Sequence, residues 1–584
     1  MKRTDYCGRI FSDKIGERVT VCGWVQRQRD LGKLIFVDLR DITGIVQLAF
    51  YKNNPEVFEQ AFHLRAEFVI MASGFVRERL SKNPDLRTGD IEIEIERLKV
   101  YSKSQTPPFE IVEDSNASEE LRLRFRYLDL RRQDMARNII MRHEIAALVR
   151  DYFYKNKFIE IETPFLIRST PEGARDYLVP SRVFKGKFFA LPQSPQLYKQ
   201  IAMISGFDRY VQIVKCFRDE DLRMDRQPEF TQIDMEMSFV DSDDIMSMVE
   251  GLVVKIYSHV LSKQIKTPFL RMSYDDCMRR FGSDKPDLRF EMEIIHLSDL
   301  LKETKFKPFS DALEPGGSVC AVNAKGAFDK FSRKRLDKLS EWIKRYGPKA
   351  VLFSKFALNA SVSSSYEKFL TQQEIDAVRQ KANFEPGDVL LLVASEDRTT
   401  CLEAAGALRL EIADVIDIQK SEHSILWVTD FPLFERSKEQ SRLASKHHPF
   451  VAPKDEDIKF LKEDPEKVRA KAFDLVINGN EVGGGSIRID DAEIQKKIFS
   501  CLNFSDSEVQ ERFGFLVNAM RFGVPPHGGL AFGFDRLIMT LLGCESIRDV
   551  IAFPKISTSL ELMTSSPGAV SKEQLKELGI KIDD

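Results

Sequence analysis

Arg218 is one of two arginines in this sequence that are well placed to act on phosphate groups. It ends the apolar stretch 210–217, and Glu220 follows two residues later. A guanidinium there can grip an α-phosphate through two parallel hydrogen bonds, where negative charge builds up during displacement. Phe230, which opens the next apolar stretch, can stack on a base. An isolated Arg-x-Glu is more often a surface ion pair in a hairpin, so this segment alone leaves both interpretations open.

Arg536 lies in a second segment of this kind, 528–537, where glycines precede an apolar helical pattern. Glycine lets the backbone approach a ligand closely, and an arginine at a helix start can hold the outer phosphates of a nucleotide. Such turns also occur without a ligand. The chain has neither a GxxxxGK[ST] phosphate loop nor a GxGxxG turn, so side chains would have to bind the nucleotide.

The elements that must position these arginines are strands and a long helix. Apolar residues at helical spacing over 137–157 predict an amphipathic helix, and the alternating stretch 158–165 predicts a strand that ends at Pro164. The stretches 210–217 and 231–237 predict two further strands joined by a long loop. These two strands would point Arg218 and Glu220 into one cleft.

Residues 1–105 have a different pattern, with apolar and polar residues alternating most clearly over 91–96. About five short strands, interrupted by a helical pattern at 56–65, predict a small closed barrel of the oligonucleotide-binding (OB) type. A β-domain without a ligand is the plain alternative. Pro107 and Pro108 cannot continue a strand ladder and favour a domain boundary.

The bulk composition is that of a large folded protein. A chain of 584 residues exceeds what one hydrophobic core can organise, and 43% hydrophobic with 30% charged residues excludes disorder. The eight cysteines are scattered without a CxxC pair, which predicts reduced thiols. No apolar run is long enough for a signal peptide or a membrane span, so we expect a cytoplasmic protein with no membrane partner. A net charge of −3 does not exclude a local nucleic-acid site.

Taken in order, the three segments resemble the signature motifs of class II aminoacyl-tRNA synthetases. These motifs are the helix and strand ending at Pro164, the Arg218/Glu220 hairpin with Phe230, and the Arg536 helix. The class I signatures HIGH and KMSKS are absent. Four longer strings extend the resemblance to the bacterial-type aspartyl-tRNA synthetases of subclass IIb; they occupy 169–176, 193–200, 447–450 and 480–488.

The resemblance implies a multidomain α+β fold with an OB-fold β-barrel, a class II catalytic core on an antiparallel sheet and an inserted α/β domain. The expected parts are an anticodon-binding barrel at 1–105, a linker or hinge at 106–136, the first core part with motifs 1 and 2 at 137–286, a bacterial-type insertion at 287–422, the second core part with motif 3 at 423–555 and a C-terminal extension at 556–584.

For activity, the resemblance implies ATP-dependent activation of L-aspartate to aspartyl-adenylate, then transfer to the 3′ end of tRNA. A substrate carboxylate needs cations that stay charged when partly desolvated, which suits Arg488 and Lys199. The implied aspartate-binding residues are Glu172, Ser194, Gln196, Lys199, Arg218, Asp234, His447 and Arg488. The implied ATP-binding residues are Arg218, Asp219, Glu220, Gln227, Phe230, Glu481, Gly533, Phe534, Asp535 and Arg536, of which Arg218, Glu220 and Arg536 are expected to be catalytic.

Glu481, helped by Asp474, is the expected Mg²⁺ ligand, because Mg²⁺ prefers hard oxygen donors together with substrate phosphates. His447 and His448 also suggest a metal. However, adjacent residues on an extended chain point to opposite sides, and no third Cys or His lies near, so a loop histidine or an amino-acid contact is favoured.

The barrel would then recognise the anticodon through Arg29, Phe36, Gln47 and Glu94, by stacking and by hydrogen bonds to base edges. The expected partners are tRNA(Asp), L-aspartate and a second copy of the chain, which pairs through the helix and strand ending at Pro164. Whether tRNA(Asn) is also charged stays open.

Three alternatives remain. Asparaginyl- and lysyl-tRNA synthetases share the barrel and core, but the large insertion and the longer strings favour aspartate. A non-catalytic RNA-binding relative is a second alternative. It would not need to keep Arg218, Arg536 and Glu481, so their presence argues against it. A tRNA-independent asparagine synthetase on the same core would lack the barrel.

Overall fold

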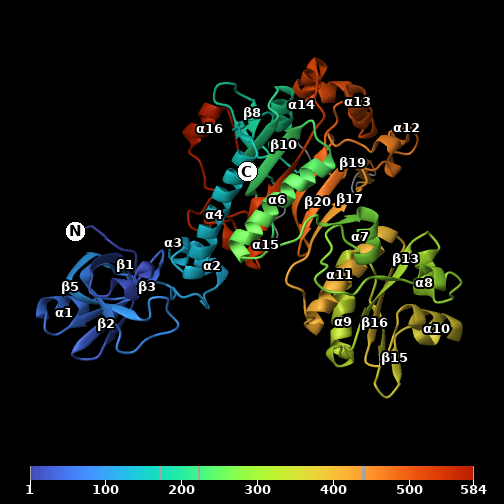
Figure 1. Cartoon of the computed structure of the whole chain (residues 1–584). Helices are drawn as coiled ribbons and strands as arrows, with labels where there is room; N and C mark the ends of the chain where they lie inside the picture. Colours follow the sequence, from blue (N-terminus) through green and yellow to red (C-terminus); the bar gives the residue numbers. More distant parts are fainter. Residues whose placement is uncertain (1, 171–173, 221–223, 437–441, 583–584) are drawn as a thin grey trace. The chain divides into compact units, whose positions relative to one another are not determined.

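The structure is a computed structural model that describes residues 2–170, 174–220, 224–436 and 442–582. The chain forms two compact units, and Figure 1 labels the helices and strands of both. The first contains residues up to 144, 224–227 and 545–570, and the second contains 145–220, 228–544 and the chain from 571. Each is described by itself.

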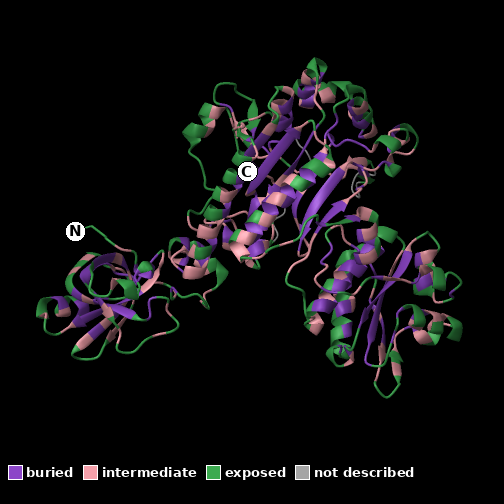
Figure 2. Ribbon diagram, viewed as in Figure 1, coloured by how far each residue is buried: buried purple, intermediate pink, exposed green. Residues whose placement is uncertain are grey.

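A closed five-stranded barrel fills most of the first unit. Its strands run in the order β1-β2-β3-β5-β4, with β3 and β5 parallel and the other pairs antiparallel. The elements are β1 (Arg18–Asp30), β2 (Leu34–Asp41), β3 (Gly44–Tyr51), α1 (Pro55–Phe62), β4 (Val69–Glu78) and β5 (Ile91–Ser102). Alternate side chains of each strand point inward and form one buried core, purple in Figure 2. The predicted OB-type barrel is confirmed.

One glycine lets two barrel strands approach closely. A Cβ on Gly74 would lie 1.8 Å from the carbonyl oxygen of Glu94, at a bulge where β4 crosses β5. The helices of the first unit that follow the barrel are α2 (Glu119–Arg124), α3 (Arg126–Asp129) and the start of α4 (Gln133–Lys155).

An eight-stranded sheet organises the second unit, in the order β11-β17-β20-β21-β22-β10-β9-β6. Its strands are β6 (Ile159–Glu160), β9 (Arg209–Phe217), β10 (Glu229–Ser238), β11 (Leu270–Ser273), β17 (Ile425–Thr429), β20 (Ala472–Ile477), β21 (Asn480–Ile487) and β22 (His527–Gly533). Only the two edge pairs, β6–β9 and β11–β17, are parallel. The antiparallel core expected from the sequence is therefore present.

Helices pack on this sheet and position its loops. The main ones are α5 (Gln196–Ile204), α6 (Ser242–Leu261), α7 (Tyr274–Phe281), α13 (Ala492–Cys501), α14 (Asp506–Ala519) and α15 (Phe534–Leu542). Smaller elements are β7 (Leu178–Pro180), β8 (Phe188–Ala190), β18 (Phe434–Arg436), β19 (Leu443–Ser445), α12 (Phe460–Glu463) and α16 (Lys572–Leu578). An Asp241 capping box begins α6, and Gly543 in the left-handed region ends α15.

The strand expected over 158–165 is shorter than its alternation predicts. Only Ile159–Glu160 pairs, at the edge of the sheet against β9. Pro164 has no N–H to donate, and Ile159, Phe165 and Leu166 are exposed rather than buried in the single chain.

The inserted part is a five-stranded sheet in the order β12-β13-β16-β14-β15, with antiparallel pairing and a core on each face. Its elements are β12 (Ile295–His296), α8 (Lys307–Leu313), β13 (Ser318–Ala324), α9 (Arg333–Trp342), β14 (Leu352–Phe356), β15 (Val362–Ser364), α10 (Gln372–Lys381), β16 (Val389–Ser395) and α11 (Arg398–Ile416). Helices α9 and α11 contribute to one core, and α8 and α10 to the other. Within the described ranges, no helix is both long and apolar enough to cross a membrane.

Candidate active site

Four buried charged side chains form the centre of the site. Lys199 on α5 places its Nζ 2.7 Å from Asp234 Oδ1 and 3.3 Å from Glu236 Oε2. Arg488, directly after β21, donates from Nε to Glu236 Oε1 at 2.8 Å and from Nη2 to Oε2 at 3.1 Å. All four are at most 2% exposed, and their formal charges cancel. A neutral cluster of this kind avoids the large cost of burying an uncompensated charge.

The two carboxylates of this cluster differ in acidity. Burial raises the pKa of Asp234, and the charge of Lys199 opposes that rise only in part. Burial also acts to raise the pKa of Glu236, but Arg488 and Lys199 outweigh it, so the pKa of Glu236 is lowered. Glu236 is therefore the permanent anion that holds the two cations in place.

Hydrogen-bonding capacity remains around this cluster for a ligand. Gln196 Nε2, Asp234 Oδ2 and Arg218 Nε are buried and have no hydrogen-bond partner among the described residues. Lys199 has three N–H donors and two described acceptors. Because buried polar groups are normally satisfied, these atoms mark where a polar ligand belongs. Ser194 lies beside them and accepts from the backbone N–H of Gln196 at 3.3 Å.

His448 contacts the cluster, although the sequence analysis did not assign it to the substrate. Arg488 Nη1 lies 3.0 Å from His448 Nε2 and also bonds Ser486 Oγ. Burial and then the charge of Arg488 hold the pKa of His448 well below its ordinary value of 6.5, so this imidazole is neutral at pH 7. A neutral imidazole here adds no charge to the balanced cluster and accepts from the Arg488 guanidinium.

Arg218 and Phe230 come together as expected. The Arg218 guanidinium carbon lies 5.1 Å from the centroid of the Phe230 ring, and the backbone N–H of Arg218 donates to Pro228 O at 2.8 Å. Asp219 follows, and its N–H donates to Arg175 O. An arginine over an aromatic ring at the end of a strand fits a site that holds a base and a phosphate together.

Arg536 lies in the first turn of α15, just after Gly533, and donates from Nη1 to the carbonyl oxygen of Glu481 at 2.8 Å. Asp535 accepts from the backbone N–H of Thr231 on β10 at 2.8 Å, and both Asp535 and Phe534 are 2% exposed. The side chains of Phe534 and Asp535 therefore anchor α15, and Arg536 provides a positive charge at the start of this helix.

Two predicted metal ligands converge on β20 and β21. Asp474 pairs in register with Gly484, and a Cβ on Gly484 would lie 2.9 Å from Asp474 Oδ1 and 3.8 Å from Glu481 Oε1. The glycine thus leaves a space that both carboxylates face. His447 Nε2 lies 3.4 Å from Asp474 Oδ1.

Among the predicted residues that the structure describes, Gln227 and Glu220 lie apart from the Lys199–Arg488 cluster. Glu172 lies outside the described residues. Gln227 belongs to the first unit, where its amide exchanges hydrogen bonds of 2.9 and 2.8 Å with the backbone of Lys555. Glu220 is described and takes part in interactions, but it is not one of the buried group.

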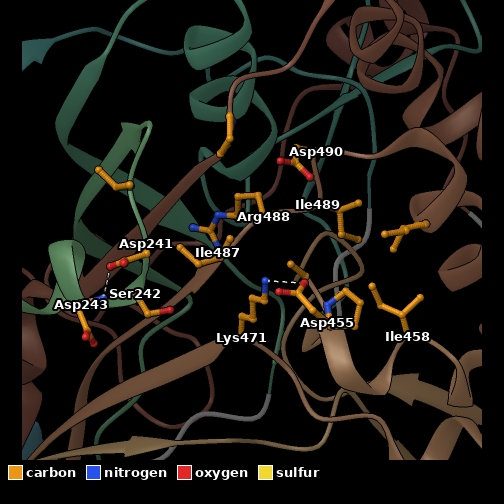
Figure 3. A pocket seen from close by; sticks show the side chains of 15 residues that line it. Asp241, Ser242, Asp243, Asp455, Ile458, Lys471, Ile487, Arg488, Ile489 and Asp490 are labelled. Carbon is orange, nitrogen blue, oxygen red and sulfur yellow. Dashed lines mark hydrogen bonds and ion pairs between the residues drawn. The ribbon is translucent and has the colours of Figure 1, made fainter.

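A cavity of about 470 Å³ also borders Arg488 but does not suit an acidic substrate (Figure 3). Lys471 is paired with Asp455 at 2.8 Å on its wall. Asp241, Asp243 and Asp490 add further carboxylates. Its acidic wall disfavours phosphate and carboxylate ligands, so this cavity is not a candidate for an acidic substrate.

On the barrel, the predicted anticodon residues form one polar network. Gln47 Oε1 accepts from Arg29 Nη2 at 2.9 Å and from Arg79 Nη2 at 2.8 Å, and Gln47 Nε2 donates to Glu92 Oε2 at 2.7 Å. The half-buried Phe36 lies under Arg29, with 5.7 Å from the guanidinium carbon to the ring centroid.

The neighbouring Arg77 joins Glu92 and Glu94 at 2.8 and 2.9 Å. The sequence analysis missed Arg77, Arg79 and Glu92. Their spacing of two, 77 with 79 at the end of β4 and 92 with 94 on β5, is the signal that could have identified this face.

Comparisons with known proteins identify the family of this chain and of its two domains. The family described as tRNA synthetases class II (D, K and N) matches residues 118–557, and the OB-fold nucleic acid binding domain matches residues 19–101. The aspartate–tRNA ligase of Ruminiclostridium cellulolyticum is 52% identical over all of this chain and 98% of its own length. The aspartate–tRNA(Asp/Asn) ligase of Caldanaerobacter subterraneus subsp. tengcongensis is 51% identical over all of this chain and 99% of its own length.

Two solved structures share the fold at low sequence identity. Asparaginyl-tRNA synthetase from Pyrococcus horikoshii matches with a TM-score of 0.59 at 20% identity, covering 95% of this chain and 98% of that one. Aspartyl-tRNA synthetase from Entamoeba histolytica matches with a TM-score of 0.58 at 19% identity, covering 95% and 91%. With full-length relatives above 50% identity, this chain belongs to the aspartate–tRNA ligases, a family of class II tRNA synthetases.

Proposed function

We propose that the buried Lys199–Asp234–Glu236–Arg488 cluster selects L-aspartate by its side-chain carboxylate, for activation by ATP and transfer to tRNA(Asp). The observation that carries this is the pair of cations held by Glu236 beside unsatisfied polar atoms. Asparagine would place its side-chain amide N–H donors against the N–H donors of Lys199 and Arg488 and leave buried groups unpaired. Such mismatches reject an analogue by large factors.

Activation needs positioning and charge neutralisation rather than a side-chain nucleophile. The aspartate α-carboxylate attacks the α-phosphorus in line, and Arg218 stabilises the negative charge that develops there. Phe230 stacks on the adenine, and Arg536 receives the departing pyrophosphate. The ribose hydroxyl at the 3′ end of tRNA then attacks the carbonyl carbon of aspartyl-adenylate, and AMP leaves.

Mg²⁺ fits the space that Asp474 and Glu481 share at Gly484. Among the described residues no group of three or more His, Cys, Asp or Glu is suited to hold a metal ion. Two carboxylates suit Mg²⁺ when substrate phosphates supply its other ligands, and an ion held by Asp474 and Glu481 would neutralise phosphate charge.

The barrel face around Gln47 supports anticodon recognition. Phe36 offers a ring for stacking, and Arg29 and Glu94 offer a donor and an acceptor for base edges, while the buried Gln47 holds Arg29 in place. Of the two relatives at 51–52% identity, one is named for tRNA(Asp/Asn) and the other is not. Charging assays with purified tRNA(Asp) and tRNA(Asn) test whether this chain aminoacylates one of these tRNAs or both.

Exposed apolar side chains support a homodimer. Tyr154, Ile159, Phe165 and Leu166 are exposed along the end of α4 and the segment through Pro164. A cavity of about 360 Å³ beside them is lined by Val149, Tyr154, Phe158 and Val211. Apolar surface of this extent suits burial against a second copy. The free cysteines of the described chain are consistent with a reducing cytoplasm.

Pyrophosphate exchange with each of the twenty amino acids tests the proposal directly. We expect exchange with aspartate alone, and loss of that exchange in Arg488→Leu while ATP binding survives. Exchange with asparagine or lysine would move the chain to a sister specificity. No exchange with any amino acid, from folded protein with Mg²⁺, would support a non-catalytic RNA-binding role.

A further inference from the structure

A buried carboxylate, Glu67, ties the barrel to the linker that follows it. Glu67 is 5% exposed and precedes β4. Its Oε1 and Oε2 accept from Arg40 Nη2 of β2 at 2.8 and 2.9 Å, and Oε2 also accepts from Arg131 Nη1 of the linker at 2.8 Å. One carboxylate therefore holds an arginine of the barrel and an arginine of the linker.

The backbone around Glu67 shows that its position is specific. Glu67 has φ 63°, a left-handed conformation that is unfavourable for residues other than glycine. Hydrogen bonds between Glu67 N and Val25 O, at 2.7 Å, and between Val25 N and Phe68 O, at 2.9 Å, hold it there. The strained turn thus aims the carboxylate at the two arginines.

Arg131 makes a second contact with the barrel. Its guanidinium carbon lies 5.1 Å from the ring centroid of Trp24 on β1, so one side chain combines an ion pair with a cation–π contact. Arg131 keeps 28% of its side chain exposed, whereas Arg40 and Glu67 are buried. Removing Arg131 would therefore release the linker without opening the barrel core.

A second arginine of the linker, five residues before Arg131, contacts another part of the first unit. Arg126 in α3 is buried and donates to the backbone carbonyls of Arg548, Ile551 and Ala552 at 2.8, 2.8 and 2.9 Å, as well as to Asp129 at 2.5 Å. The segment 548–552 follows helix α15, which carries Arg536, in the sequence. The linker is thus fixed both to the barrel and to the chain that leaves motif 3.

We propose that Arg131 and Glu67 are positioning residues that clamp the barrel to the linker, so that a tRNA bound by its anticodon delivers its 3′ end for aminoacylation. Neither residue belongs to the polar face around Gln47 or to the Lys199–Arg488 cluster. The proposal rests on the anticodon-binding role proposed for the barrel. The clamp would couple anticodon binding on the barrel to aminoacylation of the same tRNA.

The test compares Arg131→Ala with Arg124→Ala, which removes a cation from the same linker at an exposed Arg124–Glu120 pair. For Arg131→Ala we expect kcat for charging full-length tRNA(Asp) to fall about tenfold or more, the size of effect that follows from losing a charge-assisted hydrogen bond. Its affinity for an anticodon stem-loop RNA, its charging of an acceptor-stem minihelix and its aspartate-dependent pyrophosphate exchange should all stay unchanged. Arg124→Ala should change none of these.

Two conservative variants complete the experiment. Glu67→Gln keeps the side-chain volume and should reproduce the loss with full-length tRNA, while Arg131→Lys keeps the charge and should restore part of it. Full-length charging by Arg131→Ala equal to that of Arg124→Ala would overturn the clamp. The clamp would also be overturned if Arg131→Ala lost stem-loop affinity by the same factor as full-length charging, because Arg131 would then only maintain the barrel. An equal loss in charging the minihelix would overturn it too. Failure of the proposed function would appear separately, as wild-type protein that does not charge tRNA or bind the stem-loop.

Discussion

Glu236 and Arg488 form a two-point ion pair that is fully buried beneath the candidate substrate site, with donor–acceptor distances of 2.8 and 3.1 Å. The pair uses the Nε edge of the guanidinium and leaves Nη1 beside His448 and Ser486. Glu236 therefore sets the orientation in which Arg488 meets a ligand. In this arrangement Glu236 acts through Arg488 and need not touch aspartate.

Glu236→Gln should weaken aspartate binding without affecting ATP. The amide keeps the volume but loses the negative charge, so Arg488 and Lys199 lose their shared anion and repel each other. The loss of charge-assisted hydrogen bonds of roughly 1.5–3 kcal/mol predicts a 10- to 100-fold higher KM for aspartate in pyrophosphate exchange. The KM for ATP should stay near the wild-type value. An unchanged aspartate KM in a folded variant would remove Glu236 from this role.

Gln47→Ala should weaken tRNA recognition while leaving amino-acid activation intact. The change deletes the acceptor shared by Arg29 and Arg79 and the donor to Glu92, so the polar face loses its centre. We expect kcat/KM for tRNA(Asp) to fall roughly 10- to 100-fold, as for the loss of one or two good base contacts of about 1–3 kcal/mol each. Exposed Gln60→Ala on α1 of the same barrel serves as the control. Equal charging by both variants would contradict the assignment.

Local patterns predicted much of this site, and long-range pairing explains what they missed. Arg218 and Arg536 follow a strand and a glycine-rich turn that are visible in the sequence, and Phe230 opens an apolar stretch. Glu236 was missed although it lies two residues after Asp234 on β10, a spacing that places both carboxylates on one face of the strand.

Other features depend on contacts that no local pattern contains. Asp535 accepts a hydrogen bond from the backbone N–H of Thr231, and Gln227 pairs with Lys555, which lies 328 residues later. The strand expected over 158–165 shrinks to two residues because only Ile159–Glu160 finds a partner on β9. The barrel, by contrast, follows from its period of two, because one face of every strand must be buried.

Arg409→Leu should destabilise the inserted domain. Arg409 on α11 is 1% exposed and donates to the carbonyl oxygens of Asp287, Phe290 and Met292 at 2.7 to 3.0 Å. Burial lowers its pKa to about 10, so it remains charged at pH 7. Three buried acceptors without a donor predict a loss of about 3 kcal/mol or more.

Hydrogen exchange measures this effect where it is expected. Amides in the insertion should lose protection in Arg409→Leu. They should not do so in Arg333→Leu, which breaks an exposed pair worth about 0.5 kcal/mol or less. Equal protection in the two variants would show that the three carbonyls find other donors.

His448 should make the stability of the catalytic unit depend on pH. Its folded pKa lies well below the ordinary 6.5 because of burial and the charge of Arg488. As the pH falls below about 6.5, the unfolded chain takes up a proton on this residue that the folded chain refuses, so stability falls by up to about 1.4 kcal/mol per pH unit. Asp234, whose pKa is raised by burial, acts in the opposite direction. It is present both in wild type and in the variant His448→Gln, so its effect cancels in the comparison. The melting temperature of wild type should therefore decrease more steeply from pH 7.5 to 5.5 than that of His448→Gln, in calorimetry at fixed ionic strength. Parallel curves would mean that His448 takes up its proton equally in both states and is not held neutral by Arg488.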